Sequence, residues 1–241
     1  MIQRVVARAL PLALLTVSIA LVALAGAWLR LVPPLPAFGL FVLALLGGGG
    51  LTVVVGLTGV VRGGDGRGAA ALATAVGGVC VGLLAALVLQ ARGAPPIHDI
   101  TTDFEEPPQF RAATRAAENQ GRDLTYPNGA ATTAEQQRAA YPDLDSIAVD
   151  VPPAAAFASV LRVAEQLGWT VVQQDAAAGL LEATDETGVF GFVDDIVVRV
   201  RPAGAGSIID ARSLSRLGVS DLGANAARIR AMRDALLTDR R

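Results

Sequence analysis

Two stretches of the sequence carry side chains that could do chemistry. The first, IHDITTD at residues 97–103, contains His98, the only histidine of the chain. An imidazole beside carboxylates is a ligand set that suits zinc, iron or manganese. The candidate residues for a metal-dependent or hydrolytic site are His98, Asp99, Asp103, Asp194 and Asp195, the last two from GFVDDIVV at 191–198.

The spacing of these residues also fits a structural role. Successive residues rarely face one ion, and a second histidine is missing. Adjacent residues of a strand point to opposite faces, so Asp194 and Asp195 cannot line one site without a bulge. The β-branched segment 97–103 is typical of an edge strand or strap whose Asp and Thr side chains bond the nearby backbone. We therefore expect no metal and no cofactor.

The second stretch, RSLSRLGVSDLGANAARIR at residues 212–230, combines arginines with hydroxyls at the start of an expected helix. Free N–H groups at a helix N-terminus and guanidinium groups together suit a phosphate or carboxylate, such as a phospholipid headgroup. The candidate ligand-binding residues are Arg212, Ser213, Ser215, Arg216, Ser220 and Asn225. The competing interpretation, which we prefer, is a helix capped by Ser220, with Asp221 in its first turn and the arginines in internal ion pairs.

Charge and apolar residues are unevenly distributed along the 241 residues. The net charge is +5 up to Arg92 and −7 beyond it. An acidic domain repels phosphate backbones, which argues against nucleic-acid binding. The chain has no lysine and one cysteine, Cys80, so it forms no Schiff base, no intramolecular disulfide and no cysteine-based metal site. GGVCVG lies inside an apolar run and lacks the strand–helix context of a nucleotide-binding motif.

Three apolar runs, Ala9–Leu29, Phe38–Val61 and Ala69–Ala91, are each long enough to cross a membrane as a helix. GGGG at 47–50 weakens the second run as a helix and favours close backbone approach instead, as does Gly78-x-x-x-Gly82 in the third. Arginines 4, 8, 62 and 67 fall on one side and arginines 30 and 92 on the other, which predicts a cytoplasmic N-terminus. The first run also resembles a signal peptide with ALAG as a cleavage site, an alternative that leaves the C-terminal domain outside as well.

The remaining chain indicates a strap followed by a globular domain. Residues 93–145 show no sustained apolar period and predict an irregular strap with short helical pieces at Phe110–Asn119 and Thr133–Ala139. Residues 146–241 give the order β-α-β-β-β-β-α, with the last helix running from Ser220 to about Leu237. The fold class is therefore α+β: three transmembrane helices (1–92), the strap, and an antiparallel sheet with helices on one face.

The fourth strand of this domain makes a specific prediction about register. If PAGAGS at 202–207 closes a hairpin, Val200 lies opposite Ile209 and Val198 opposite Ala211 on the core face. Arg199 then faces Asp210 on the outer face as an exposed pair that contributes roughly 0–1 kcal/mol.

Four blocks resemble a known family: IHDITTD, QRAAYPDL, GFVDDIVVRV and RSLSRLGVSDLGANAARIR. They are similar to the uncharacterised bacterial and plastid family called domain of unknown function 1499, over about residues 95–237. The resemblance implies an envelope or organelle-membrane setting and no established reaction. It does not extend to the three apolar runs.

We expect a multi-pass protein of the bacterial inner (plasma) membrane with a periplasmic C-terminal domain. Its expected partners are the lipid bilayer and an envelope protein or amphiphile, but not nucleic acid. The function we expect is the binding of a partner protein or of a lipid-like or anionic ligand, without catalysis. The alternative is a membrane-associated hydrolase or metal-dependent enzyme that uses His98 and nearby aspartates.

Overall fold

The computed structural model describes residues 7–90, 92–126, 131–218 and 220–238. The chain forms two compact units. The helical unit extends to Arg92 and includes Thr187–Gly191, and the sheet unit contains Gly93–Glu186 and Phe192–Arg241. Each unit is built on a different packing principle.

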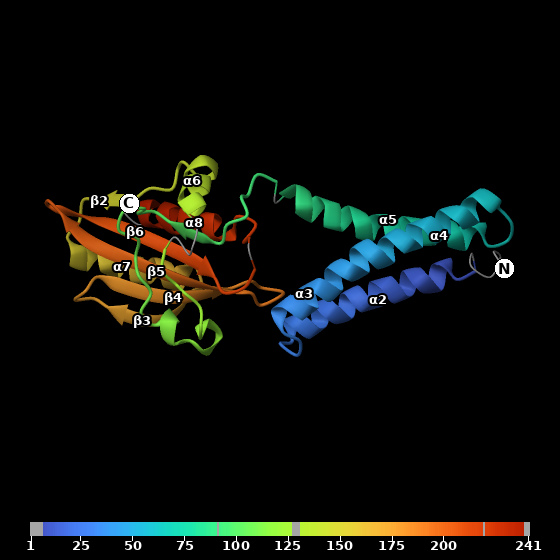
Figure 1. Ribbon diagram of the computed structural model, residues 1–241, viewed down its shortest axis with the longest axis horizontal. Coiled ribbons are helices and arrows are strands. Elements are labelled where there is room, and N and C mark those ends of the chain that lie inside the picture. The colour runs from blue at the N-terminus through green and yellow to red at the C-terminus, as the bar shows by residue number, and fades with distance from the viewer. Residues whose placement is uncertain (1–6, 91, 127–130, 219, 239–241) are drawn as a thin grey trace. The chain divides into compact units, whose positions relative to one another are not determined.

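The helical unit contains three helices that are long and apolar enough to cross a membrane, as the sequence predicts. They are α2 (Ala9–Trp28), a long helix from Pro34 to Arg62, and α5 (Arg67–Gln90) (Figure 1). The long helix consists of α3 (Pro34–Leu43), a π-helical turn η1 (Ala44–Gly48) and α4 (Gly49–Arg62). Of the arginines used to predict orientation, Arg4 lies outside the described residues.

Small residues form the interior of the helical unit and large ones its outer surface. The buried positions of α2 are Ala9, Ala13, Thr16, Ala20, Ala23 and Ala27. The exposed positions include Leu14, Leu15, Leu21 and Val22. A water-soluble bundle would bury the leucines, whereas helices in lipid pack through small residues that let their backbones approach. This distribution suits a lipid environment.

Two glycines bring α4 and α5 into close contact. A Cβ atom on Gly49 would lie 2.9 Å from Cβ of Cys80, and one on Gly77 would lie 2.7 Å from the Gly49 carbonyl oxygen. The GGGG segment therefore serves close approach, and the chain stays helical through it, but its first two glycines belong to the π-helical turn that interrupts the regular α-helix. The expectation for Gly78 and Gly82 is wrong, since both face open space. Neighbouring residues of a helix point about 100° apart, so a shift of one position moves the contact to Gly77.

The sheet unit contains one antiparallel sheet of six strands in the order β1-β6-β5-β4-β3, with β2 also paired to β6. The strands are β1 (Asp99–Thr101), β2 (Ile147–Val149), β3 (Thr170–Asp175), β4 (Leu180–Glu186), β5 (Val193–Ala203) and β6 (Gly206–Ser215). Helix α7 (Pro153–Gln166) follows β2, and α8 (Ala224–Thr238) follows β6. The predicted order β-α-β-β-β-β-α is confirmed. Strand β1, from IHDITTD, precedes it at the edge of the sheet.

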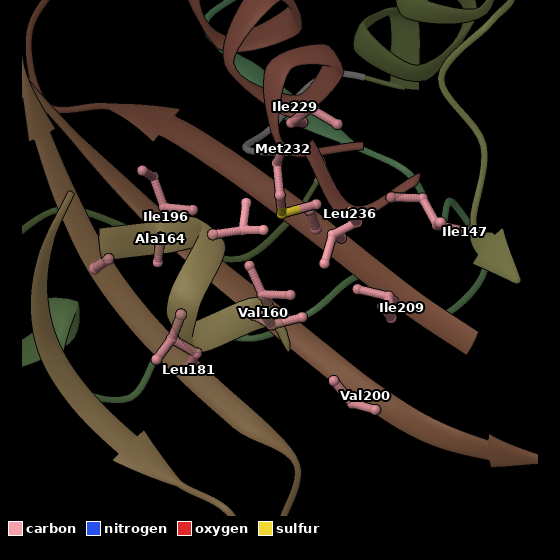
Figure 2. Packing of buried hydrophobic residues seen from close by; sticks show 14 of the residues in the cluster. Ile147, Val160, Ala164, Leu181, Ile196, Val200, Ile209, Ile229, Met232 and Leu236 are labelled. Atoms are coloured by element: carbon pink, nitrogen blue, oxygen red, sulfur yellow. The ribbon is translucent and has the colours of Figure 1, made fainter. Parts of the chain in front are cut away.

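The main core lies between the two helices and one face of the sheet. Figure 2 shows Val160 of α7 and Met232 and Leu236 of α8 among Ile196, Ile209 and other apolar strand residues. The predicted register is confirmed, since Val198 pairs with Ala211 and Val200 with Ile209. All four of these side chains are buried in this core.

A strap covers the opposite face of the sheet. Residues 103–126 form this strap, with 3-10 turns η2 (Ala113–Arg115) and η3 (Ala117–Asn119), and α6 (Ala131–Ala140) follows it. Phe110, Ala113 and Leu124 of the strap form a second apolar cluster with Val197 and Leu214 of the sheet. The short helical pieces expected in this segment are present as these turns and as α6.

Candidate functional site

Arg212 lies in the middle of β6 on the strap side and is fully buried. Its Nε and Nη2 atoms each donate to Asp99 of β1 at 2.8 Å, which gives a bidentate ion pair. The guanidinium also donates to the carbonyl oxygens of Leu124 at 2.7 Å and Pro108 at 3.3 Å. The hydrogen bonds of Arg212 thus link β1, at the edge of the sheet, to the strap.

Two aromatic rings enclose the same guanidinium. Its central carbon lies 4.9 Å from the ring centroid of Phe110 and 5.4 Å from that of Tyr126. Burial, with the Asp99 carboxylate nearby, raises the pKa of Tyr126 to about 12. A cation between ring faces in a desolvated place is stabilised by their quadrupoles. Phe110 and Tyr126 therefore fix the strap over Arg212.

A second cluster connects α8 to the helix side of the sheet. Arg228 donates to Asp185 at 2.8 Å, to Asp194 at 2.7 Å, and to Ser213 and Asn225 at 3.0 and 2.6 Å. Asn225 lies one helical turn before Arg228, so the two side chains share a face. Arg228 is a residue that the sequence interpretation missed, although its spacing from Asn225 and the acidic pair in β5 could have indicated it.

Asn225 extends this cluster to β6 and to the segment before β1. Its amide nitrogen donates to the Ser215 hydroxyl and to the His98 carbonyl oxygen, both at 3.0 Å. Its amide oxygen accepts from Ser213 at 2.6 Å. Of the predicted ligand-binding residues, Ser213, Ser215 and Asn225 therefore meet, whereas Arg212 points to the other face of the same strand.

A third cluster lies on the strap side. Arg216 donates to the two oxygens of Asp195 at 3.0 and 2.8 Å, and to Glu118 at 3.2 Å. Asn119 donates to Asp195 at 2.8 Å. Asp194 and Asp195 thus face opposite sides of the sheet, as expected, and each pairs with its own arginine.

The fourth cluster corrects one expectation. Arg199 faces Asp210, as predicted, at 3.0 Å, but the pair is not exposed. The Asp210 carboxylate is fully buried, and Arg201 and Asp103 complete the cluster, because the strap covers this face. Although burial opposes it, the pKa of Asp103 is lowered by the backbone N–H groups of Glu106 and Glu105 and then by the two guanidiniums.

The start of α8 differs from the predicted cap. The helix begins at Ala224, and the Asp221 carboxylate accepts from the N–H groups of Gly223 and Asn225 at 2.9 and 2.7 Å. Ser220 instead accepts from the N–H of Leu222 at 3.3 Å. Leu222 and Gly223 both have positive φ angles, which turn the chain between Ser220 and the helix. Asp221 is therefore the residue that caps α8, and the prediction for Ser220 is wrong.

His98 contributes its backbone to this network. Its carbonyl oxygen accepts from the Ser215 N–H at 2.9 Å in addition to the Asn225 amide. The four aspartates proposed as its co-ligands pair with different arginines. Asp99 binds Arg212, and Asp103 binds Arg199 and Arg201. Asp195 binds Arg216, and Asp194 binds Arg228. Among the described residues no three His, Cys, Asp or Glu side chains are placed to hold a metal ion.

Two grooves complete the candidate surfaces, one in each unit. The groove of the sheet unit has a volume of about 300 Å³ and lies where α7 ends beside α8. It is lined by Leu167, Trp169, Asp185, Ala224, Ala227, Arg228 and Ala231. The groove of the helical unit, of about 410 Å³, is lined by Phe41, Leu83, Ala86 and Leu87.

Comparison with known proteins gives one informative match. No curated protein matches the chain. A crystal structure of Ara h 8.0201 matches with 14% identity and a TM-score of 0.23, over 39% of this chain and 95% of that one, values that carry no functional information. The family described as protein of unknown function DUF1499 matches residues 99–236, which is more than half of the chain. These residues contain the whole sheet and every side chain of the four clusters, and the chain belongs to the DUF1499 family.

Proposed function

We propose that this protein is a non-enzymatic, membrane-anchored protein of the bacterial cell envelope. Its sheet unit would lie outside the cytoplasm and bind a partner protein or a lipid-like ligand at the membrane surface. The observation that carries the proposal is that the carboxylates considered for catalysis are already bound by arginines of the same domain. Asp99, Asp103, Asp194 and Asp195 are all hydrogen-bonded to arginines. These groups hold the fold together.

The arrangement of arginines around the spans supports the orientation. Arg8, Arg62 and Arg67 flank the ends of helices on one side, and Arg30 and Arg92 flank those on the other. Arg4 adds to the first group by its position in the sequence. Short loops rich in arginine remain in the cytoplasm, so the N-terminus lies inside and the sheet unit outside.

The groove beside Trp169 is the binding surface that fits best. Alanines form its α8 side, and Leu167 and Trp169 line it from the chain between α7 and β3. Arg228 lies at one side, but its guanidinium already donates to Asp185, Asp194 and Asn225. The groove therefore offers an apolar wall beside the paired Arg228 and Asp185, and an acyl chain or an apolar side chain of a partner fits it better than a free anion.

The test uses a variant that fills the groove. Ala227→Trp places an indole among the lining residues, and Ala155→Trp puts the same side chain on an exposed position of α7. Protein extracted with its surrounding lipid and without detergent is analysed by native mass spectrometry. A bound lipid or partner that is present in the wild type and in Ala155→Trp, but lost in Ala227→Trp, is the expected result. Wild-type protein that carries no bound molecule would contradict the proposal.

A complementation experiment separates binding from catalysis. In a strain that lacks the gene, His98→Ala should restore the phenotype fully, since the structure uses the His98 backbone in its interactions with β6 and α8. Loss of complementation by a folded His98→Ala variant would favour the enzyme alternative instead.

A further inference from the structure

Two exposed leucines, Leu217 and Leu222, occur in the short stretch of sequence between β6 and α8. The exposed large apolar side chains described in the sheet unit are Val151 (38% exposed), Val172 (49%), Leu217 (44%), Leu222 (61%) and Leu237 (45%). Leu217 and Leu222 lie in one loop, and Leu222 is the most exposed of the five. Scattered exposed apolar residues are normal, but two in one short loop need an explanation.

Leu222 combines this exposure with an unfavourable backbone conformation. Its φ angle is +54°, in the left-handed region that glycine and asparagine adopt far more easily than leucine. Its N–H bonds the Ser220 hydroxyl, which any residue except proline would allow at this position. The turn therefore needs a residue in the left-handed region here, and most of the leucine side chain that occupies it is exposed.

Only a short stretch of chain separates α5 from the residues that bind this loop. Helix α5 ends at Gln90, and Ala94 follows four residues later, a length of chain that reaches at most about 14 Å. A Cβ atom on Gly223 would lie 3.8 Å from Cβ of Ala94. Ser220 bonds the carbonyl of Pro95, and the Asp221 N–H bonds that of Ile97. Residues 220–223 are therefore tethered to the end of an apolar span by a few residues of chain.

We propose that Leu217 and Leu222 insert into the phospholipid bilayer that contains α5, as a second attachment of the sheet unit to the membrane. The contact is with the boundary between headgroups and acyl chains, where exposed leucines lose contact with water. It depends on the helices crossing the bilayer but not on which side the sheet unit faces. It is separate from the groove beside Trp169 and does not require a ligand there.

Site-specific fluorescence in reconstituted protein tests this contact. Leu217→Cys, Leu222→Cys and Leu237→Cys are each made in the full chain with Cys80→Ala and labelled with an environment-sensitive dye. Leu237 is the matched control, because it is the same residue type with the same exposure as Leu217. It lies at the far end of α8, whose 15 residues rise about 1.5 Å each. The vesicles contain phosphatidylcholine, phosphatidylglycerol and a lipid with a nitroxide near its headgroup.

The expected result is quenching by the nitroxide lipid that is several-fold stronger at positions 217 and 222 than at 237. Iodide in the water should quench in the opposite order. Equal quenching at all three positions by either quencher would overturn the proposal.

A second variant tests the role of the Leu222 side chain without changing the backbone conformation of the loop. Leu222→Asn keeps a residue that tolerates positive φ and removes the apolar side chain. It should unfold in detergent at the wild-type temperature or above, and it should halve the lipid quenching of a dye at position 217. Unchanged quenching in this folded variant would show that Leu222 does not hold the loop in the bilayer. The groove experiment with Ala227→Trp has a different readout, so either proposal can fail alone.

Discussion

At the scale of single residues, arginine performs every cationic role in this chain, because lysine is absent. A guanidinium presents five donors in a planar fork, so one side chain can bond two or three acceptors at fixed angles. Arg212, Arg216 and Arg228 use this geometry at three separate places in the sheet unit. Each binds a carboxylate from another element. The three pairs therefore favour one way of packing these elements together.

The pair between Arg212 and Asp99 should be the most sensitive to substitution. Asp99→Asn removes the charge that compensates a fully buried guanidinium, and breaking such a pair costs about 3–5 kcal/mol. Asp143→Asn weakens the partly exposed pairs with Arg230 and Arg233, where a loss of about 0–1 kcal/mol per pair is expected. Urea unfolding followed by tryptophan fluorescence and near-ultraviolet circular dichroism measures both. Equal losses in the two variants would contradict the structural role of Arg212.

Asp103 should make the sheet unit sensitive to acid. Because its pKa is lowered in the folded protein, the stability that its charge contributes is complete above the usual value of about 3.9. That stability is lost as the pH falls through the lowered pKa. The melting temperature of the wild type should therefore drop below about pH 4 more steeply than that of Asp103→Asn. Asp145→Asn, at an exposed position, should follow the wild type, and parallel curves for all three proteins would refute the assignment.

At the scale of elements, β6 is the strand around which the sheet unit is organised. It pairs with β1, β2 and β5. Its alternating residues divide between the two faces, so that Ile209 and Ala211 meet the helices while Leu214 meets the strap. Both faces are therefore covered, although only one of them is covered by helices.

Glu182 of β4 should fix the strap to this sheet. Its buried carboxylate accepts from the backbone N–H groups of Arg111, Ala112 and Ala113 at distances of 2.7–3.0 Å. Glu182→Gln removes the charge and one acceptor, which leaves a buried N–H group unpaired at a cost of about 1–3 kcal/mol. Amide hydrogen exchange at residues 111–113 should accelerate by about 10-fold or more, which corresponds to about 1.4 kcal/mol. The exposed substitution Glu165→Gln should leave these amides unchanged, and unchanged exchange in Glu182→Gln would show that the strap is held by its apolar contacts alone.

Periodic elements could be predicted from the sequence, but irregular ones could not be placed. The strands alternate with a period of two, which together with the PAGAGS turn predicts the observed pairing of Val198 with Ala211. The strap has no period, so its position over Val197 and the burial of Asp210 that follows from it had no local signal. The sequence predicts the start of α8 incorrectly for a similar reason. Ser220 and Asp221 are both good capping residues, and the positive φ of Leu222 that decides between them is unusual for leucine.

At the scale of the whole molecule, two opposite packing patterns occur in one chain. The helical unit buries alanine, glycine and threonine and exposes leucine and valine. The sheet unit buries isoleucine, valine, leucine and methionine around ion pairs. Each pattern is stable in a different solvent, lipid for the first and water for the second. The boundary between the two patterns falls near Arg92, where the net charge of the sequence also changes sign.

The orientation of the chain should depend on a small number of arginines. Four arginines against two favour a cytoplasmic N-terminus, so a reporter active only outside the cytoplasm should be active when fused after Arg241 and inactive in the loop at Gly64. Replacing both Arg62 and Arg67 by glutamine leaves two arginines on each side, so mixed orientations are expected, with activity from both fusions. Replacing Arg30 and Arg92 by glutamine strengthens the bias and should leave the wild-type pattern unchanged. Activity from the loop fusion alone in the wild type would reverse the topology, and the sheet unit would then face the cytoplasm.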